Sequence, residues 1–171
     1  MKHAFALTTL LLLSLSSNAL FANTASINTP LKVVGKAEMR WLMFPLYQIS
    51  LKTPDGRYQK NRFPQVLDIM YRRSIEKRDL LTATDQQWQR LGLPLEQRQN
   101  WIKQLNAIWP TVRSGDRLGF QADAQGKNHF TYNGKNIGGV ADTQFAQSFL
   151  AIWLSPKTSQ PGIRQRLIGP S

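Results

Sequence analysis

Hydrophobic and polar residues alternate along two early stretches of the chain, which is the pattern of β-strands. In residues 39–51 one alternate set includes Trp41 and Tyr47, and the other set is also largely apolar at its start. This double pattern predicts one strand that is covered on both faces. Pro45 within it predicts either a bulge or a position at the edge of the sheet. Residues 65–74 alternate again and predict a second strand.

Further along, the hydrophobic spacing changes from that of strands to that of helices and back again. Apolar residues recur every three or four positions in four segments, which predicts four amphipathic helices. The turn Asn133-Gly134 separates two short strands and predicts a tight hairpin, because both turn positions need a positive φ. The predicted elements are strands at 39–51 and 65–74, helices at 75–91 and 94–109, strands at 118–122, 129–132 and 135–137, and helices at 142–154 and 159–167.

This order of elements predicts an α+β fold. Strands separated by tight turns pair as antiparallel neighbours, and helices that come in blocks pack together on one face of the sheet. No internal repeat or linker divides the chain, whose 171 residues suit one domain. Four tryptophans fall on the apolar stripes of the predicted helices, where core packing against the sheet explains them. They are Trp88, Trp101, Trp109 and Trp153.

The start of the chain has the organisation of a secretory signal peptide. A short basic segment is followed by an apolar run over residues 4–15 and then by small residues. We expect cleavage after Ala22, with Ala19 and Ala25 as alternatives, and a periplasmic or secreted mature protein. The apolar run is shorter than the roughly 20 residues that span a bilayer, so no transmembrane segment is expected, and an uncleaved anchor is the alternative. The expected divisions are a signal peptide at 1–22, a flexible lead at 23–30 and a folded domain at 31–171.

The composition removes several classes of chemistry. The chain has no cysteine, so it can form no disulfide, thiolate nucleophile or iron–sulfur cluster. Its two histidines and its ten singly spaced carboxylates indicate neither a metal site nor a paired-carboxylate catalytic site. The glycine-rich residues 134–139 lack the Lys-Ser or Lys-Thr ending of a phosphate-binding loop. We therefore expect no metal and no cofactor.

The formal net charge of +12 indicates anionic partners. Nucleic acid is not expected, because an exported protein seldom meets it and the basic residues are scattered instead of forming a polybasic run. A small amphipathic or acidic ligand and an anionic surface of the cell envelope are the partners that this charge favours. A basic surface that is merely solvated is the alternative.

Positive charge lies beside tyrosine on the two early strands, and this combination gives the candidate ligand-binding residues. Arg40 shares a strand with Tyr47, while Tyr71 and Arg73 share one face of the next strand with apolar neighbours. Burial of a guanidinium is costly unless an anion or another partner meets it, so we expect these four residues to line a cleft for an acidic head group. Alternation places Arg40 and Tyr47 on opposite faces unless Pro45 introduces a bulge. An arginine that reaches water from a strand end is the alternative.

Four segments together resemble the bacterial chalcone isomerase-like family. They include Gly-x-x-x-x-Arg at 35–40 and Ile-Trp-Leu-x-Pro-x-Thr-Ser at 152–159. The resemblance implies an open-faced β-sandwich, in which helices cover a large antiparallel sheet, and this agrees with the order of elements above. It also implies a periplasmic location. The segments are residues 34–51, 68–73, 134–138 and 149–159, within a likeness that spans most of residues 31–169.

The family name comes from plant enzymes that close a chalcone to a flavanone, with an arginine that holds the oxyanion and polar groups that polarise the ketone. Relatives without isomerase activity use an arginine and a tyrosine in the same cleft to bind a fatty-acid carboxylate. Strict spacing places the plant arginine near Gly35 or Lys36 and the tyrosine of the fatty-acid binders near Lys52, so this chain reproduces neither set. We therefore expect a non-catalytic protein that binds a fatty acid or another amphipathic anion in an apolar cleft. An intramolecular lyase that acts on an enone and an envelope-associated interaction module are the alternatives.

Overall fold

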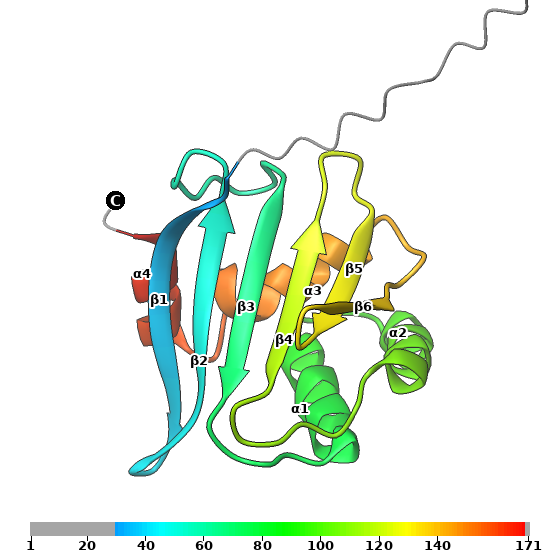
Figure 1. Cartoon of the computed structure of the whole chain (residues 1–171). Helices are drawn as coiled ribbons and strands as arrows, with labels where there is room; N and C mark the ends of the chain where they lie inside the picture. The colour runs from blue at the N-terminus through cyan, green and yellow to red at the C-terminus, as the bar shows by residue number, and fades with distance from the viewer. Residues whose placement is uncertain (1–29, 170–171) are drawn as a thin grey trace, which may run out of the picture.

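One antiparallel sheet of six strands runs through the part of the chain that the structure describes, residues 30–169 of a computed structural model (Figure 1). The strands lie side by side in chain order, so each one pairs with the strand that precedes it in the sequence. The expected signal peptide at 1–22 lies outside the described residues, as does nearly all of the expected lead at 23–30. The strands are β1 Lys32–Trp41, β2 Phe44–Thr53, β3 Gln65–Tyr71, β4 Arg117–Ala122, β5 Asn128–Tyr132 and β6 Lys135–Gly138.

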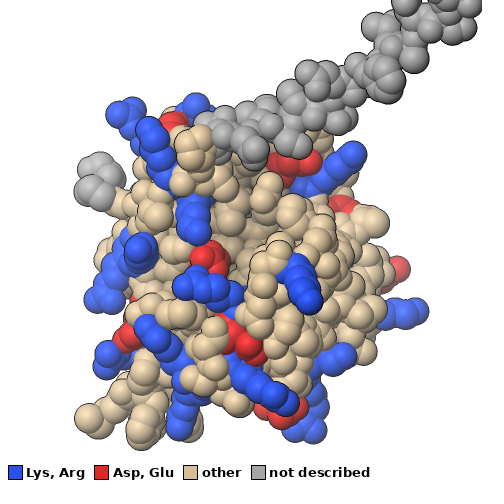
Figure 2. All heavy atoms as spheres, in the orientation of Figure 1, with Lys and Arg blue, Asp and Glu red and all other residues tan. Residues whose placement is uncertain are grey.

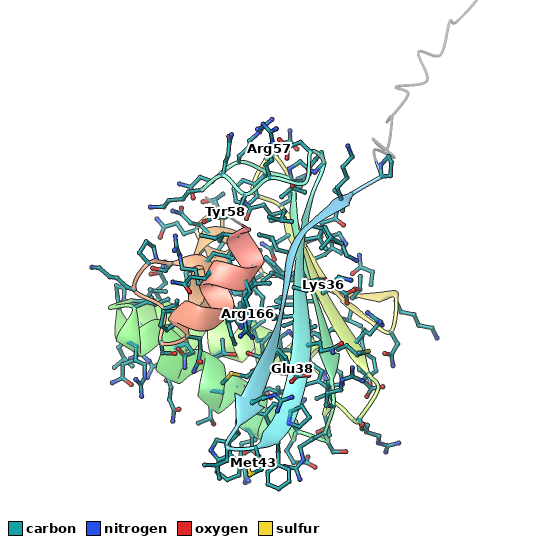
Figure 3. All side chains as sticks on the ribbon, turned by 90° about the vertical axis from the view of Figure 1, so that its left-hand side faces the viewer. Lys36, Glu38, Met43, Arg57, Tyr58 and Arg166 are labelled. Atoms are coloured by element: carbon teal, nitrogen blue, oxygen red, sulfur yellow. The ribbon has the colours of Figure 1, made fainter. Side chains whose placement is uncertain are left out.

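Four helices cover one face of this sheet, as the side view in Figure 3 shows. This arrangement confirms the α+β fold with an antiparallel sheet covered by helices. Gly92 ends the first helix with a φ of 82°, a conformation that suits glycine, and Pro94 precedes the second. Within residues 30–169, no helix has the length and apolar character needed to span a membrane. The helices are α1 Lys77–Arg90, α2 Leu95–Ile108, α3 Phe145–Leu154 and α4 Pro161–Ile168.

The stretch at residues 39–51 contributes to two strands, so the prediction of one long strand is wrong. The chain reverses at Leu42 and Met43 between β1 and β2, and the sheet has six strands where the sequence predicted five. Alternation did not reveal the turn, because both residues are apolar and neither is the glycine, asparagine or aspartate that marks most two-residue turns. Leu42 adopts a φ of 55°, which is uncommon outside those residue types.

A bulge in β2 lies close to this turn. Met39 of β1 pairs with Tyr47, whereas the next residue, Arg40, pairs with Pro45, so Leu46 is the extra residue of the bulge. The irregularity expected at Pro45 is therefore present, one residue further along. Because neighbouring residues of a strand point to opposite faces, Arg40 points away from the face that carries Met39 and Tyr47.

The core between the sheet and the helices is built mainly from aromatic side chains. Phe120 and Phe130 of adjacent strands pack with their ring centroids 4.8 Å apart, and Phe149 of α3 packs on both. The four tryptophans expected in the core are buried there, each with at most 9% of its surface exposed. Trp101 donates its Nε1–H to Asp142 at 2.8 Å, so its polar atom is satisfied.

Two glycines shape the edges of the sheet. Gly134 and the preceding Asn133 have φ values of 84° and 49° and form the β5–β6 hairpin that the sequence predicted. At the other edge, α4 approaches β1 so closely at Gly35 that a Cβ there would collide with the carbonyl oxygen of Arg166. The C-terminal helix is thereby held against β1 and closes that side of the core.

Candidate functional site

A cavity of about 660 Å³ lies between the helices and the sheet, on the side of the β1–β2 hairpin. Strands β1 to β4 contribute to one wall, α1 lies on another side, and α3 with the residue after α2 completes the enclosure. The volume falls within the range of roughly 300–1,000 Å³ that is typical of small-molecule sites. Its apolar lining includes Met39, Trp41, Leu46, Ile69, Leu118 and Phe149.

The cavity opens between the hairpin and α1. Trp41 at the end of β1 is 62% exposed, and the side chain of Asp79 on α1 is 58% exposed. Ile69, Leu118 and Phe149 line the floor and are almost completely buried, with at most 3% of their surface exposed. The cavity is thus a slot with a closed apolar floor and an entrance that carries an exposed indole.

Tyr47 contacts two other aromatic residues in the cavity wall, one through its ring and one through a hydrogen bond. Tyr47 of β2 is opposite Tyr71 of β3 in the sheet, and their rings meet edge to face with centroids 6.0 Å apart. Trp153 of α3 donates its Nε1–H to the hydroxyl oxygen of Tyr47 at 3.0 Å. Since the Tyr47 oxygen is the acceptor in this bond, its own proton remains available to a group in the cavity.

Two further donors in the cavity wall have no partner among the described residues. The Nε1–H of Trp109 is buried and makes no hydrogen bond within residues 30–169, although only 4% of this residue is exposed. The hydroxyl of Tyr71 likewise has no hydrogen-bond partner in that part of the chain. Buried donors without a partner are rare, so each one in a native structure requires an explanation. A bound molecule with a hydrogen-bond acceptor would partner the Tyr71 hydroxyl, whereas Trp109 Nε1 exposes almost no surface to the cavity.

Burial keeps both tyrosines protonated. It raises the pKa of Tyr47, and the hydrogen bond from Trp153 opposes part of that increase. It also raises the pKa of Tyr71 strongly, and the neighbouring Tyr47 phenol acts in the same direction. Phenols in this state donate hydrogen bonds and do not act as bases at neutral pH. The wall is therefore suited to holding an acceptor group.

Of the four candidate residues, the structure brings Tyr47 and Tyr71 together in the cavity and leaves the two arginines outside its lining. Arg40 is exposed and pairs with a glutamate of its own strand. Arg73 is also exposed and lies two residues beyond β3, with its guanidinium 4.9 Å from the centre of the Phe44 ring. Ligand binding by all four residues stays a prediction.

The sequence did not identify Trp109 and Trp153 as part of the cavity. Both are buried as expected, but an apolar stripe does not show where close packing stops and a cavity begins. The available signal was the indole N–H, which needs a hydrogen-bond partner wherever a tryptophan is buried. Trp41 could have lined a pocket or simply belonged to a strand, and it does both.

A second concavity, of about 630 Å³ and lined by charged and apolar residues alike, lies along the sheet. Asp68 in this concavity accepts from Lys52 at 3.3 Å and from Arg117 at 3.0 Å. Figure 2 shows basic and acidic side chains interspersed over the visible face. No group of three or more metal-ligating side chains occurs in the described part of the chain. The apolar cavity, with the unpartnered Tyr71 hydroxyl in its wall, is therefore the candidate site.

Comparison with known proteins gives the family of this fold and cavity. Residues 19–169 match the chalcone isomerase-like family. An uncharacterized protein of Haemophilus influenzae is 29% identical over 136 residues, which cover 80% of this chain and 67% of that protein. A fatty-acid binding protein of Arabidopsis thaliana shares the fold with a TM-score of 0.62 and 9% identity, over 81% of this chain and 86% of that one. Because the family match covers the whole sheet and the helices that enclose the cavity, this chain belongs to the chalcone isomerase-like family.

Proposed function

We propose that this protein binds a fatty acid or a related amphipathic molecule in the cavity, without catalysis. The observation that carries the proposal is an apolar cavity with the unpartnered hydroxyl of Tyr71 in its wall. An apolar slot selects an apolar body, and a few donors in the wall select an acceptor at one end of that body. A fatty acid combines these two parts.

The donors determine which way round such a ligand lies. Tyr71 lacks a partner and Tyr47 has a proton to donate, so a carboxyl, ester or amide head group would accept hydrogen bonds from this part of the wall. The alkyl chain would then extend along the apolar lining toward the entrance at Trp41.

The charge of the lining gives this site a pH dependence. Asp79 at the entrance is the only charged residue among the described residues that line the cavity. A carboxylate would lose its hydration on entry and gain no counter-charge, whereas a neutral carboxylic acid loses far less. We therefore expect the affinity for a fatty acid to fall as the pH rises above the pKa of the ligand. The affinity for a fatty alcohol of the same length should stay constant, and isothermal titration at a series of pH values measures both.

The structural neighbour from Arabidopsis thaliana supports the proposal as an analogy of fold. It is named as a fatty-acid binding protein, so a fold of this kind is compatible with such a ligand. A shared fold does not by itself carry a function, and the argument for this chain rests on its own cavity and donors.

Three ligands that share one alkyl chain and differ in their head groups test the proposal. They are a fatty acid, the matching alcohol and the matching trimethylammonium cation. We expect the acid and the alcohol, which carry acceptors, to bind more tightly than the cation, which carries none. Tyr71→Phe removes one donor with little change of shape and should weaken binding of the acid by roughly 2- to 10-fold. Tyr58→Phe, whose ring lies outside this cavity, is the matched control.

Two outcomes would contradict the proposal. Equal binding of all three ligands, or binding of none, would remove the role given to the donors and the cavity. Turnover of an enone that is lost in Tyr71→Phe, while the variant remains folded, would replace non-catalytic binding by an intramolecular lyase.

We also propose that the protein is exported, because residues 1–22 have the basic, apolar and small-residue order of a signal peptide. The intact mass of the protein from separate cell fractions tests this. A chain that begins at Asn23 in the periplasmic or extracellular fraction supports export, and a full-length chain confined to the cytoplasm contradicts it.

A further inference from the structure

The tip of the β1–β2 hairpin, residues 41–44, is the most exposed apolar segment of the described chain. It contributes four of the six large hydrophobic residues that are exposed within residues 30–169. Figure 3 shows Met43 at the far end of the hairpin, opposite the end of the molecule that carries Arg57. The exposed fractions are 62% for Trp41, 77% for Leu42, 83% for Met43 and 53% for Phe44.

We propose that this tip inserts into the interfacial region of a lipid bilayer that contains anionic lipids. The inference goes beyond ligand binding and does not depend on which molecule occupies the cavity. It rests on the residue types of the turn, on the charges beside it and on the size of the apolar patch.

The residue types of the turn are not those that the fold requires. A two-residue hairpin turn favours asparagine, aspartate or glycine, and the β5–β6 hairpin of this chain uses Asn133 and Gly134. The β1–β2 turn instead has Leu42 at a φ of 55° followed by Met43. Both side chains are in water, so packing does not explain them. A departure from local rules without a structural gain is typical of a functional position.

Two basic side chains lie next to the apolar tip. Arg73 holds its guanidinium over the Phe44 ring at 4.9 Å, and its neighbour Arg72 is also exposed. Neither arginine forms an ion pair within the described residues, whereas Arg40 is paired with Glu38. Aromatic and aliphatic side chains in front of free guanidinium groups match the layers of a bilayer interface, where anionic head groups cover the acyl chains.

The size of the tip favours a bilayer over a protein partner. A specific protein–protein interface buries about 800 Å² on each partner and uses about 20–30 residues a side. A convex tip of four apolar residues offers far less than this, but it suffices to anchor a protein among lipid head groups when basic residues assist.

The tip also connects with the cavity. Trp41 belongs to the exposed tip and lines the entrance of the cavity. Insertion of the tip would therefore bring that entrance to the surface of the bilayer. An apolar ligand could then pass between the bilayer and the cavity without crossing water.

Flotation of the full purified protein with lipid vesicles tests the proposal. We expect the protein to bind vesicles made of equal parts phosphatidylethanolamine and phosphatidylglycerol more strongly than vesicles of phosphatidylcholine, and salt should weaken the former binding. Leu42→Gly combined with Met43→Asn installs residues that suit a turn with a positive φ at its first position, and it removes two apolar side chains. This variant should lose about tenfold or more in vesicle binding, with an unchanged or higher melting temperature.

Three further measurements locate the contact. Leu95→Asn removes an exposed apolar side chain on α2 and should leave vesicle binding unchanged. Arg72→Gln with Arg73→Gln should weaken binding to the anionic vesicles and reduce its dependence on salt. Phospholipids with brominated acyl chains should quench the fluorescence of Trp41, since the four other tryptophans of the chain are buried.

Equal flotation of the wild type and the Leu42→Gly, Met43→Asn variant would overturn the proposal, as would a wild type that does not float. If sedimentation without lipid shows a dimer that the variant loses, the tip is a contact between copies of this chain and the bilayer proposal is wrong. Ligand binding measured in solution without vesicles reports on the cavity alone, so the two proposals can fail separately.

Discussion

The two ends of the layer between the sheet and the helices use the same kind of side chain but differ in packing. Around β4, β5 and α3 aromatic rings fill the space, and the ring centroid of Phe130 lies 4.8 Å from that of Phe120 and 5.1 Å from that of Phe149. Around β1 to β3 and α1, the rings of Tyr47 and Tyr71 instead stand beside about 660 Å³ of open volume. We call these the filled half and the hollow half.

The difference lies in the polar atoms of the rings. The filled half is built around phenylalanine, whose burial needs only close packing. The hollow half contains phenol and indole groups, and these need hydrogen-bond partners as well as contact. An aromatic wall can thus serve stability or ligand binding, according to whether its polar atoms are satisfied within the protein. We expect the filled half to carry the free energy of unfolding and the hollow half to carry the affinity for the ligand.

The largest effect on the free energy of unfolding should come from removing a buried ring from the filled half. Phe130→Ala removes a ring that is completely buried among other aromatic rings, so we expect a loss of about 3–5 kcal/mol in the free energy of unfolding. Trp41→Ala, at the exposed entrance of the hollow half, should cost less than about 1 kcal/mol. Urea denaturation of both variants measures the difference, and equal costs would break the distinction between the halves.

High pH should destabilise the protein through the hollow half. Burial raises the folded-state pKa of Tyr47 and Tyr71 above the value of about 10 found in an unfolded chain. Below that pH both states hold the proton and this contribution to stability is fully present. Above it only the unfolded chain releases the proton, so stability falls by about 1.4 kcal/mol per pH unit for each phenol.

Urea denaturation at several alkaline pH values measures that slope. Tyr71→Phe cannot ionise at this position and should show a shallower decline than the wild type. A parallel decline in both proteins would mean that Tyr71 is not shielded from water in the folded state.

The next largest difference between the filled half and the hollow half should come from enlarged side chains. Leu105→Trp overfills a completely buried site on α2 and should cost about 1–3 kcal/mol or slightly more. Ile69→Trp adds the same kind of bulk at the floor of the cavity, where there is room for it, and should change the free energy of unfolding by less than about 1 kcal/mol. Thermal or urea unfolding compares them, and a large cost at Ile69 would show that the cavity floor cannot accept added volume.

The smallest effect should come from the internal hydrogen bond of the hollow half. Trp153→Phe removes the bond from the indole N–H to the Tyr47 hydroxyl, and we expect a loss of about 1 kcal/mol in the free energy of unfolding. Addition of a bound fatty acid should reduce this loss, because Tyr47 then gains another partner. Urea unfolding with and without the ligand measures both values, and no effect of the ligand would place the head group elsewhere.

Patterns in the sequence predicted the filled half better than the hollow half. Helical spacing placed Trp88 and Trp101 in the close-packed core, and Asn133-Gly134 marked the β5–β6 hairpin, because in both cases local chemistry and the fold require the same residues. The β1–β2 turn was missed because Leu42 and Met43 do not follow the chemistry of turns.

The candidate site was predicted only in part, because alternation gives the face of a strand and not the position along a cavity. It correctly put Tyr71 on an apolar face, but it could not show that Arg73 lies beyond the end of β3. Arg40 and Tyr47 stay on opposite faces in spite of the bulge at Leu46, because Tyr47 pairs with Met39, and this pairing is one that no local pattern reveals. Trp109 was expected in the core, and only the three-dimensional structure shows that its N–H is unpartnered.

Native mass spectrometry of the protein, purified from cells without detergent, tests the central claim most directly. Binding in the hollow half predicts one amphipathic molecule per wild-type chain, identified by analysis under denaturing conditions, and its loss from Ile69→Trp. A wild-type mass of protein alone, together with no uptake of an added fatty acid, would contradict the claim.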